Sequence, residues 1–137
     1  MSTYISKSLK ELVVKRAKNS CEYCQMSAKF TYFPFHIEHI VSLKHGGQSI
    51  ESNLAYSCPI CNLNKGSDIG TFVENPNVII RFYNPRIDIW EDHFCVESNG
   101  LLTAKTLIGR GTIKILNFNH IDSVIERREM IRLGIFP

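Results

Sequence analysis

The sequence lacks any apolar run that approaches the length of a membrane-spanning helix, and Met1 to Lys10 contains no hydrophobic stretch of the secretion-signal type. It also lacks internal repeats, low-complexity segments and linkers. We therefore expect a cytoplasmic protein with no membrane partner. A length of 137 residues fits one domain. We predict a single domain over 1–137, with residues 71–137 forming an extension packed on a core within 1–70.

A strong excess of one charge is absent as well. The net charge is +3 and the isoelectric point is near 8.6. Such a mild balance permits a polyanionic partner without requiring one. The composition, with 44% hydrophobic and 21% charged residues, is typical of a soluble globular fold.

Cysteines are few, but four of the five form two Cys-x-x-Cys pairs, Cys21/Cys24 and Cys58/Cys61. In a reducing compartment two such pairs favour one tetrahedral zinc ion over disulfides. Four thiolates would leave no position for water, so this zinc would be structural. A redox role for the thiols is the alternative. The remaining Cys95 lies among apolar residues and is expected to be buried.

Between and around these pairs the pattern predicts helix, strand, strand and helix. A capping box at Ser8 and Glu11 predicts a first helix over about 9–18. The stretch 30–43 is rich in aromatic and β-branched residues and reads as extended. A short strand is expected over 53–57. Pro59 then suits the start of a helix that Gly66 would end.

The C-terminal half predicts further strands over 78–83, 90–96 and 101–106, and a helix over 121–133. Phe82, Trp90 and Phe94 are expected in the core. The helix carries basic residues that we interpret as a solvated face, Arg127, Arg128 and Arg132. These elements together predict the α+β class.

The segments HIEHIVSLKHGG and SNLAYSCPICNLNKG carry an acid–His pair, a central Asn, and an Asn directly after the last cysteine. In this order and spacing they resemble the HNH endonuclease family over about 21–66. The tail, with RFYNPRIDIWEDHF, is similar to that of a bacterial HNH subfamily. The resemblance implies a ββα-metal core of the four-cysteine zinc subtype, with a small C-terminal β-hairpin and helix extension.

By this resemblance His39 is the general base and Asn53 orients it, while Glu38 and Asn62 hold a divalent ion. Carboxylate and amide oxygens suit Mg²⁺ or Mn²⁺. A neutral imidazole near pH 7 can take a proton from water. Many family members have Asp at the Glu38 position. Strict strand alternation would place Glu38 and His39 on opposite faces, so we expect the strand to end or bulge there.

Other polar residues are weaker candidates. His36 shares the strand parity of Glu38 and could be an auxiliary ligand, although a solvent-exposed histidine is the simpler interpretation. Lys65 falls on the helix face of Asn62 and is a candidate phosphate contact, with a solvated lysine as the alternative. Arg86 and Arg110 lie beside Pro and Gly in expected turns, where a guanidinium can reach phosphate.

The sequence thus predicts a metal-dependent endonuclease acting on DNA, with RNA not excluded and the oligomeric state left open. The alternative from another class is a non-catalytic, zinc-stabilised module that binds nucleic acid. A thiol–disulfide oxidoreductase is a third hypothesis, which depends on the cysteines not binding zinc.

Overall fold

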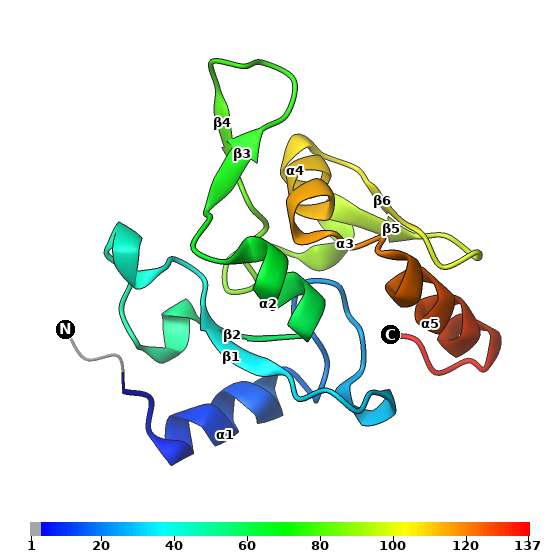
Figure 1. Ribbon diagram of the computed structural model, residues 1–137, viewed down its shortest axis with the longest axis horizontal. Helices are drawn as coiled ribbons and strands as arrows, with labels where there is room; N and C mark the ends of the chain where they lie inside the picture. The colour runs from blue at the N-terminus through cyan, green and yellow to red at the C-terminus, as the bar shows by residue number, and fades with distance from the viewer. Residues whose placement is uncertain (1–3) are drawn as a thin grey trace.

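The computed structural model describes residues 4–137, so the segment Met1 to Lys10 considered above is described only from Tyr4 onward. Helices and small antiparallel sheets alternate along the chain (Figure 1). The N-terminal half contains α1 (Lys7–Arg16), η1 (Ala28–Phe30), β1 (His36–His39), η2 (Leu43–His45), η3 (Glu51–Asn53), β2 (Leu54–Ser57) and α2 (Pro59–Lys65). The C-terminal half contains β3 (Gly70–Phe72), β4 (Ile79–Arg81), α3 (Trp90–His93), β5 (Phe94–Val96), β6 (Leu102–Ala104), α4 (Leu107–Leu116) and α5 (Ile121–Arg132).

The predicted strand–loop–strand–helix is present as β1, β2 and α2. The two strands pair antiparallel, with His36 opposite Ser57 and His39 opposite Leu54. The Sγ of Cys58 accepts a bond from the backbone N–H of Cys61 at the start of α2, and Pro59 occupies the first turn. Proline is tolerated there because its missing N–H has no partner in the first turn. The helix ends at Gly66, as expected.

The first helix begins earlier than predicted. Its N-cap is Ser6, whose hydroxyl accepts from the backbone N–H of Leu9, and not Ser8, which lies within the first turn. Two serines two residues apart offer alternative caps, and the capping-box pattern alone selected the wrong one. α1 lies along the β1–β2 sheet (Figure 1).

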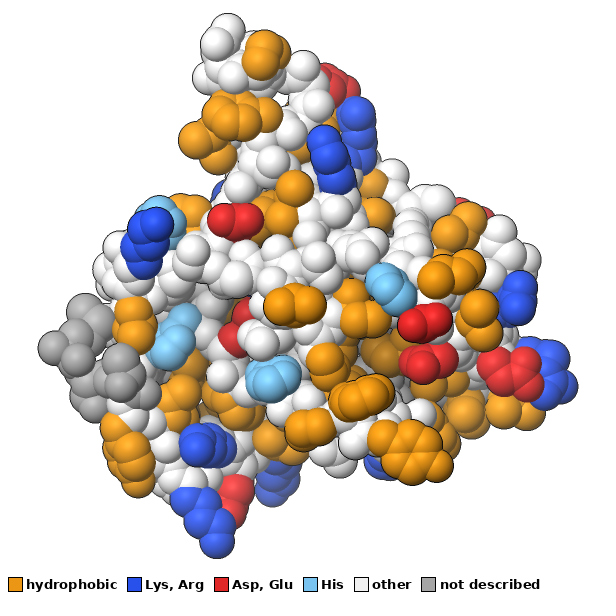
Figure 2. Space-filling model, in the orientation of Figure 1, with side chains coloured by type: hydrophobic (Ala, Val, Ile, Leu, Met, Phe, Trp, Pro, Cys, Tyr) orange, Lys and Arg blue, Asp and Glu red, His pale blue; other side chains and the backbone are white. Residues whose placement is uncertain are grey.

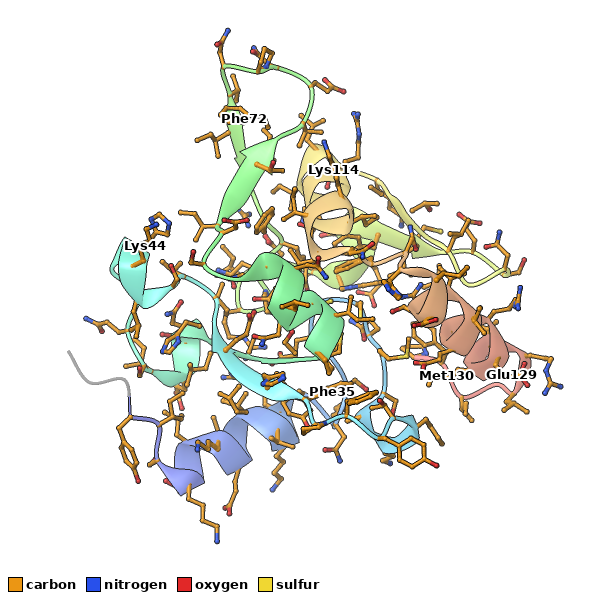
Figure 3. All side chains as sticks on the ribbon, viewed as in Figure 1. Phe35, Lys44, Phe72, Lys114, Glu129 and Met130 are labelled. Carbon is orange, nitrogen blue, oxygen red and sulfur yellow. The ribbon has the colours of Figure 1, made fainter. Side chains whose placement is uncertain are left out.

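The C-terminal half differs more from the prediction. The β3–β4 hairpin projects from the body as an arm (Figure 1), and Phe72 lies on it (Figure 3). Residues 90–93 form a helical turn, so the expected strand is reduced to β5, which pairs with β6. Helix α4 was not predicted, although Thr106 caps it by accepting from the N–H of Gly109. Its two glycines weaken a helical pattern.

One hydrophobic cluster contains residues from both halves, including the four paired cysteines and Phe118. Phe82, Trp90 and Phe94 belong to it, as predicted. The indole N–H of Trp90 donates to the carbonyl oxygen of Tyr23 at 2.7 Å, which ties the extension to the first cysteine pair. The mixed α+β class, with an extension packed on a ββα core, is therefore confirmed. The number of domains stays a prediction.

The buried location expected for Cys95 is wrong. Cys95 is exposed, because β5 alternates and directs its neighbour Phe94 into the core. Among residues 4–137 no helix has the length and apolar character needed to cross a membrane.

Candidate metal centre and catalytic pocket

The two cysteine pairs come together in one buried cluster. One ligand atom from each of Cys21, Cys24, Cys58 and Cys61 lies within 4.8 Å of the others. The Sγ atoms of Cys24 and Cys58 are 3.7 Å apart. Zn–S bonds of about 2.3 Å in a tetrahedron separate the sulfurs by about 3.8 Å, so the cluster has the size of a zinc site. Zinc, closed to water, fits these ligands.

Local structure explains how each pair presents two sulfurs. In both pairs the second cysteine donates its backbone N–H to the sulfur of the first, at 3.5 Å for Cys24 to Cys21 and 3.4 Å for Cys61 to Cys58. Hydrogen bonds from the Cys21, Cys58 and Cys61 thiols lower the pKa of Cys24 well below its usual value. Burial raises the pKa of Cys61. A divalent cation can replace the protons of such a buried thiol cluster and compensate the negative charge of its thiolates.

Glu38, His39 and Asn62 line one surface pocket of about 430 Å³. Its remaining wall is formed by β1, the turn after it and the residues that follow α2, with Ile37, Ser42, Leu43, Lys44, Gly66 and Ser67. β1 ends at His39, and the chain bends directly afterwards. The two neighbours of opposite strand parity therefore reach the same pocket because the strand ends there, as expected from sequence.

Glu38 is almost completely buried, with 8% of its surface exposed. Burial raises the pKa of its carboxyl to about 7, while the nearby Lys65 ammonium and the Tyr23 hydroxyl act in the opposite direction. Within residues 4–137, neither Glu38 Oε1 nor the Tyr23 hydroxyl makes a hydrogen bond of standard geometry. A buried carboxylate oxygen without a donor is costly unless a cation binds it. This orphaned oxygen and the Asn62 side chain on the same pocket fit a hard divalent ion.

His39 is half-buried and its ring is fixed by a neighbour in the following loop. Nε2 lies 2.8 Å from the hydroxyl oxygen of Ser49. Burial and then the positive charge of Lys65 lower the pKa of His39. Both effects favour the neutral imidazole, which is the form that can accept a proton.

Asn53 holds the loop that follows His39. Its Oδ1 accepts from the backbone N–H of Val41, and its Nδ2 donates to the carbonyl oxygens of Val41 and Gln48, each at 2.9 Å. Gly47 lies inside this loop, where an added Cβ would be 1.7 Å from the Val41 oxygen. Asn53 thus fixes the chain on both sides of the loop between His39 and Ser49. Its side-chain bonds go to the backbone, and it acts on His39 only through the loop.

His36 does not line the pocket of Glu38. It is exposed at the other end of β1 and lines a separate hollow with Tyr4 and Lys10. His36 lies two residues from Glu38, about 7 Å along β1, and matching strand parity does not account for this distance.

The three predicted phosphate contacts lie in different settings. Lys65 is 2% exposed and donates from Nζ to the carbonyl oxygen of His39 at 3.2 Å. Arg86 forms an ion pair with Glu22, in the first cysteine knuckle, and donates to the Leu54 carbonyl. Both cations therefore stabilise the ββα core in the free protein.

Arg110 alone of the three is exposed to solvent. Its guanidinium lies on α4, 2.6 Å from the carboxylate of Glu74 in the β3–β4 arm. A phosphate could reach it only in competition with that exposed pair, which contributes little to stability.

Sequence patterns missed three residues at the pocket. Ser49 contacts the His39 ring, Tyr23 lies beneath Glu38, and Lys44 exposes an ammonium on η2 at the pocket rim (Figure 3). Tyr23 sits between the cysteines of the first pair, so its burial could have been inferred. Ser49 and Lys44 depend on the fold of the loop, for which the sequence offers no signal beyond its glycines.

On the face drawn in Figure 2, Lys and Arg side chains are spread between acidic and hydrophobic ones and form no continuous stripe. The mild net charge of +3 agrees with this distribution. Any polyanion on this face would be held by a few local contacts.

Comparison with protein families gives one match, to the model described as HNH endonuclease, over residues 21–68. The matched segment includes both cysteine pairs, both strands of the β1–β2 sheet and α2. No curated protein and no solved structure matches the chain significantly.

Proposed function

We propose that this protein, which carries an HNH endonuclease domain over residues 21–68, hydrolyses phosphodiester bonds of DNA with the help of a divalent ion. The domain supports nuclease chemistry in general. The observation that supports the specific mechanism is that Glu38, His39 and Asn62 line one pocket at the junction of β1 and α2.

In this mechanism Glu38 and Asn62 would hold Mg²⁺ or Mn²⁺, and such an ion would supply positive charge near the scissile phosphate and the leaving oxygen. Glu38 offers Oε1, which makes no hydrogen bond of standard geometry among the described residues, with the Tyr23 hydroxyl as its nearby polar neighbour. Lys65 favours the ionised form of this carboxylate against the effect of burial. With a pKa of about 7, the carboxyl is partly protonated near neutral pH, so binding of a cation would be coupled to release of that proton.

His39 takes a proton from the water that attacks phosphorus. Donation of Nε2–H to Ser49 would fix the tautomer and leave Nδ1 as the proton acceptor. Asn53 is a positioning residue, because it holds the loop that carries Ser49. A general base contributes about 10²–10⁴-fold, so the ion and substrate positioning supply the rest of the acceleration.

DNA would be held mainly through its backbone. Lys44 at the pocket rim is the exposed cation best placed to meet a phosphate, and Arg110 is a more distant candidate. Lys65 and Arg86 serve the fold in this proposal. A preference for DNA over RNA rests on the family alone.

The experiment compares cleavage of supercoiled plasmid by the zinc-loaded protein without added metal, with Mg²⁺ and with Mn²⁺. Asn62→Ala tests the ligand on α2. Asn64→Ala is the matched control, since Asn64 is exposed on the same helix and donates to the Ile60 carbonyl oxygen. We expect cleavage that requires divalent metal, is lost in Asn62→Ala and persists in Asn64→Ala. Binding of DNA without cleavage under every metal condition would favour the non-catalytic module.

A further inference from the structure

The solvated location expected for Arg127 of α5 is wrong, because its side chain is completely buried, with 0% of its surface exposed. Two of its nitrogens are accounted for: Nη1 donates to the carbonyl oxygen of Gly100 at 2.5 Å and Nη2 to that of Phe118 at 2.9 Å. Nε has no hydrogen-bond acceptor of standard geometry within residues 4–137. A buried guanidinium with an unsatisfied N–H requires a compensating anion.

The neighbours of Arg127 identify that anion. The guanidinium lies near the sulfur of Cys24, and its charge also acts on Cys61 and Cys58. α5 and the second cysteine pair are adjacent independently of this charge, because Ser123 and Glu126 line the same hollow as Cys58. Met130, one turn further along α5, packs in the same core cluster as all four cysteines.

The contact between Arg127 and the cysteines balances charge at the zinc site. Four thiolates around one Zn²⁺ carry a net charge of −2 in a buried site, and hydrogen bonds from neighbouring groups lower the cost of burying it. The cysteines come from the N-terminal half, whereas the cation comes from the last helix of the chain. The zinc site is therefore completed by a residue about 65 positions beyond its last ligand.

We propose that Arg127 is a supporting residue of the zinc centre, which neutralises part of the thiolate charge and donates its Nε–H to Cys24. The C-terminal extension then holds zinc in place and protects Cys24 from electrophiles. This inference concerns the structural zinc and is independent of the proposed nuclease reaction.

The test uses the zinc-loaded full chain and two measurements that do not involve activity. Zinc affinity is measured by competition with a chromogenic chelator, and the first cysteine alkylated by N-ethylmaleimide is identified by mass spectrometry. Arg127→Met removes the charge and the donors at similar length. We expect zinc affinity to fall about 10- to 100-fold, with faster zinc release and Cys24 alkylated first.

Thr112→Val is the matched control for a loss of buried hydrogen bonds. Thr112 is 0% exposed, accepts from the N–H of Tyr83 and donates to the Ile108 carbonyl, and neither partner is a cysteine. We expect it to lower thermal stability while leaving zinc affinity and Cys24 alkylation as in the wild type. The proposal would be overturned if Arg127→Met loses stability as Thr112→Val does but keeps the zinc affinity and the alkylation pattern of the wild type.

Should Arg127→Met fail to fold, Arg127→Lys decides the question. Lysine keeps the positive charge but places a methylene where Nε–H stood. We expect intermediate zinc affinity and increased alkylation of Cys24. A folded lysine variant whose zinc affinity and Cys24 reactivity equal those of the wild type would equally overturn the proposed contact.

Discussion

Two opposing effects act on the pKa of Glu38. Its carboxyl is buried beneath the pocket surface, and burial raises its pKa from 4.5 to about 7 against the opposing effect of Lys65. The folded-state pKa lies above the ordinary value. The neutral form therefore stabilises the fold at low pH, and this contribution is lost as the pH rises through about 7.

Replacing Glu38 by Gln should abolish this pH dependence. The free energy of unfolding of the wild type should fall relative to Glu38→Gln between pH 5 and pH 8, by about 2 kcal/mol, since each pKa unit is worth about 1.4 kcal/mol. Urea unfolding of both zinc-loaded proteins measures it, and the difference between them removes titrations that they share. Mn²⁺ should restore stability at pH 8 to the wild type only. Parallel pH profiles would contradict the assigned burial of Glu38.

At the scale of elements, the contact between α2 and β1 depends on a buried cation. Lys65 in α2 bonds the carbonyl of His39 and faces the charge of Glu38. The sequence placed Lys65 on the same helix face as Asn62, which is correct. The helical period does not determine whether that face is exposed to solvent or packs against a strand. Here the aliphatic part of the lysine side chain is buried in the core.

A double-mutant cycle measures this contact. Lys65→Met leaves Glu38 buried without its cation, and we expect a loss of about 3 kcal/mol in the free energy of unfolding. The double variant with Glu38→Gln should lose at least about 1 kcal/mol less in the free energy of unfolding than the sum of the losses of the two single variants. Urea unfolding at pH 8 provides all four values. Strict additivity would show that the two groups do not interact.

The η2 turn supplies the exposed cation at the pocket. Lys44→Ala should weaken DNA binding and reduce the slope of log affinity against log salt by about 0.9, the value for one phosphate contact. Lys114→Ala is the control, because Lys114 is also exposed but lies on α4 (Figure 3). Fluorescence anisotropy over a series of salt concentrations measures both. Equal slopes for wild type and Lys44→Ala would remove Lys44 from the interface.

Predictability from sequence also differed between elements. The ββα unit could be predicted because cysteine spacing, Pro59 and Gly66 mark its ends. Helix α4 could not be predicted, since Gly109 and Gly111 interrupt its apolar pattern. Both glycines lie where the helix approaches other residues closely, Gly109 at His93 and Gly111 at Thr71. The same limit applies to the pocket: the residues of the motif were identified, whereas Ser49 and Lys44 depend on how the loop held by Asn53 folds.

At the scale of the whole molecule, the two halves are connected through the zinc region. Trp90 bonds Tyr23, Arg86 pairs with Glu22, and Arg127 lies near Cys24. Three residues of the extension thus contact the first cysteine knuckle or its sulfurs. The zinc centre is consequently the place where the ββα core and the extension stabilise each other.

A fragment of residues 1–70 should therefore bind zinc more weakly than the full chain, although it contains all four ligands. The full chain should unfold in one transition, and removal of zinc should lower its midpoint, because zinc binds only the folded site. Circular dichroism with zinc titration measures both proteins. Equal zinc affinity of the fragment and the full chain, or separate transitions in the full chain, would contradict the single domain that we predict.

The proposed role of His39 as the base in metal-dependent cleavage is tested by single-turnover cleavage of bound DNA with His39→Ala and His36→Ala. Both histidines lie on β1, but only His39 lines the pocket of Glu38. We predict that His39→Ala cleaves at least about 10²-fold more slowly with DNA affinity unchanged, while His36→Ala keeps the wild-type rate. Wild-type cleavage by His39→Ala, or an equal loss in both variants, would contradict the account.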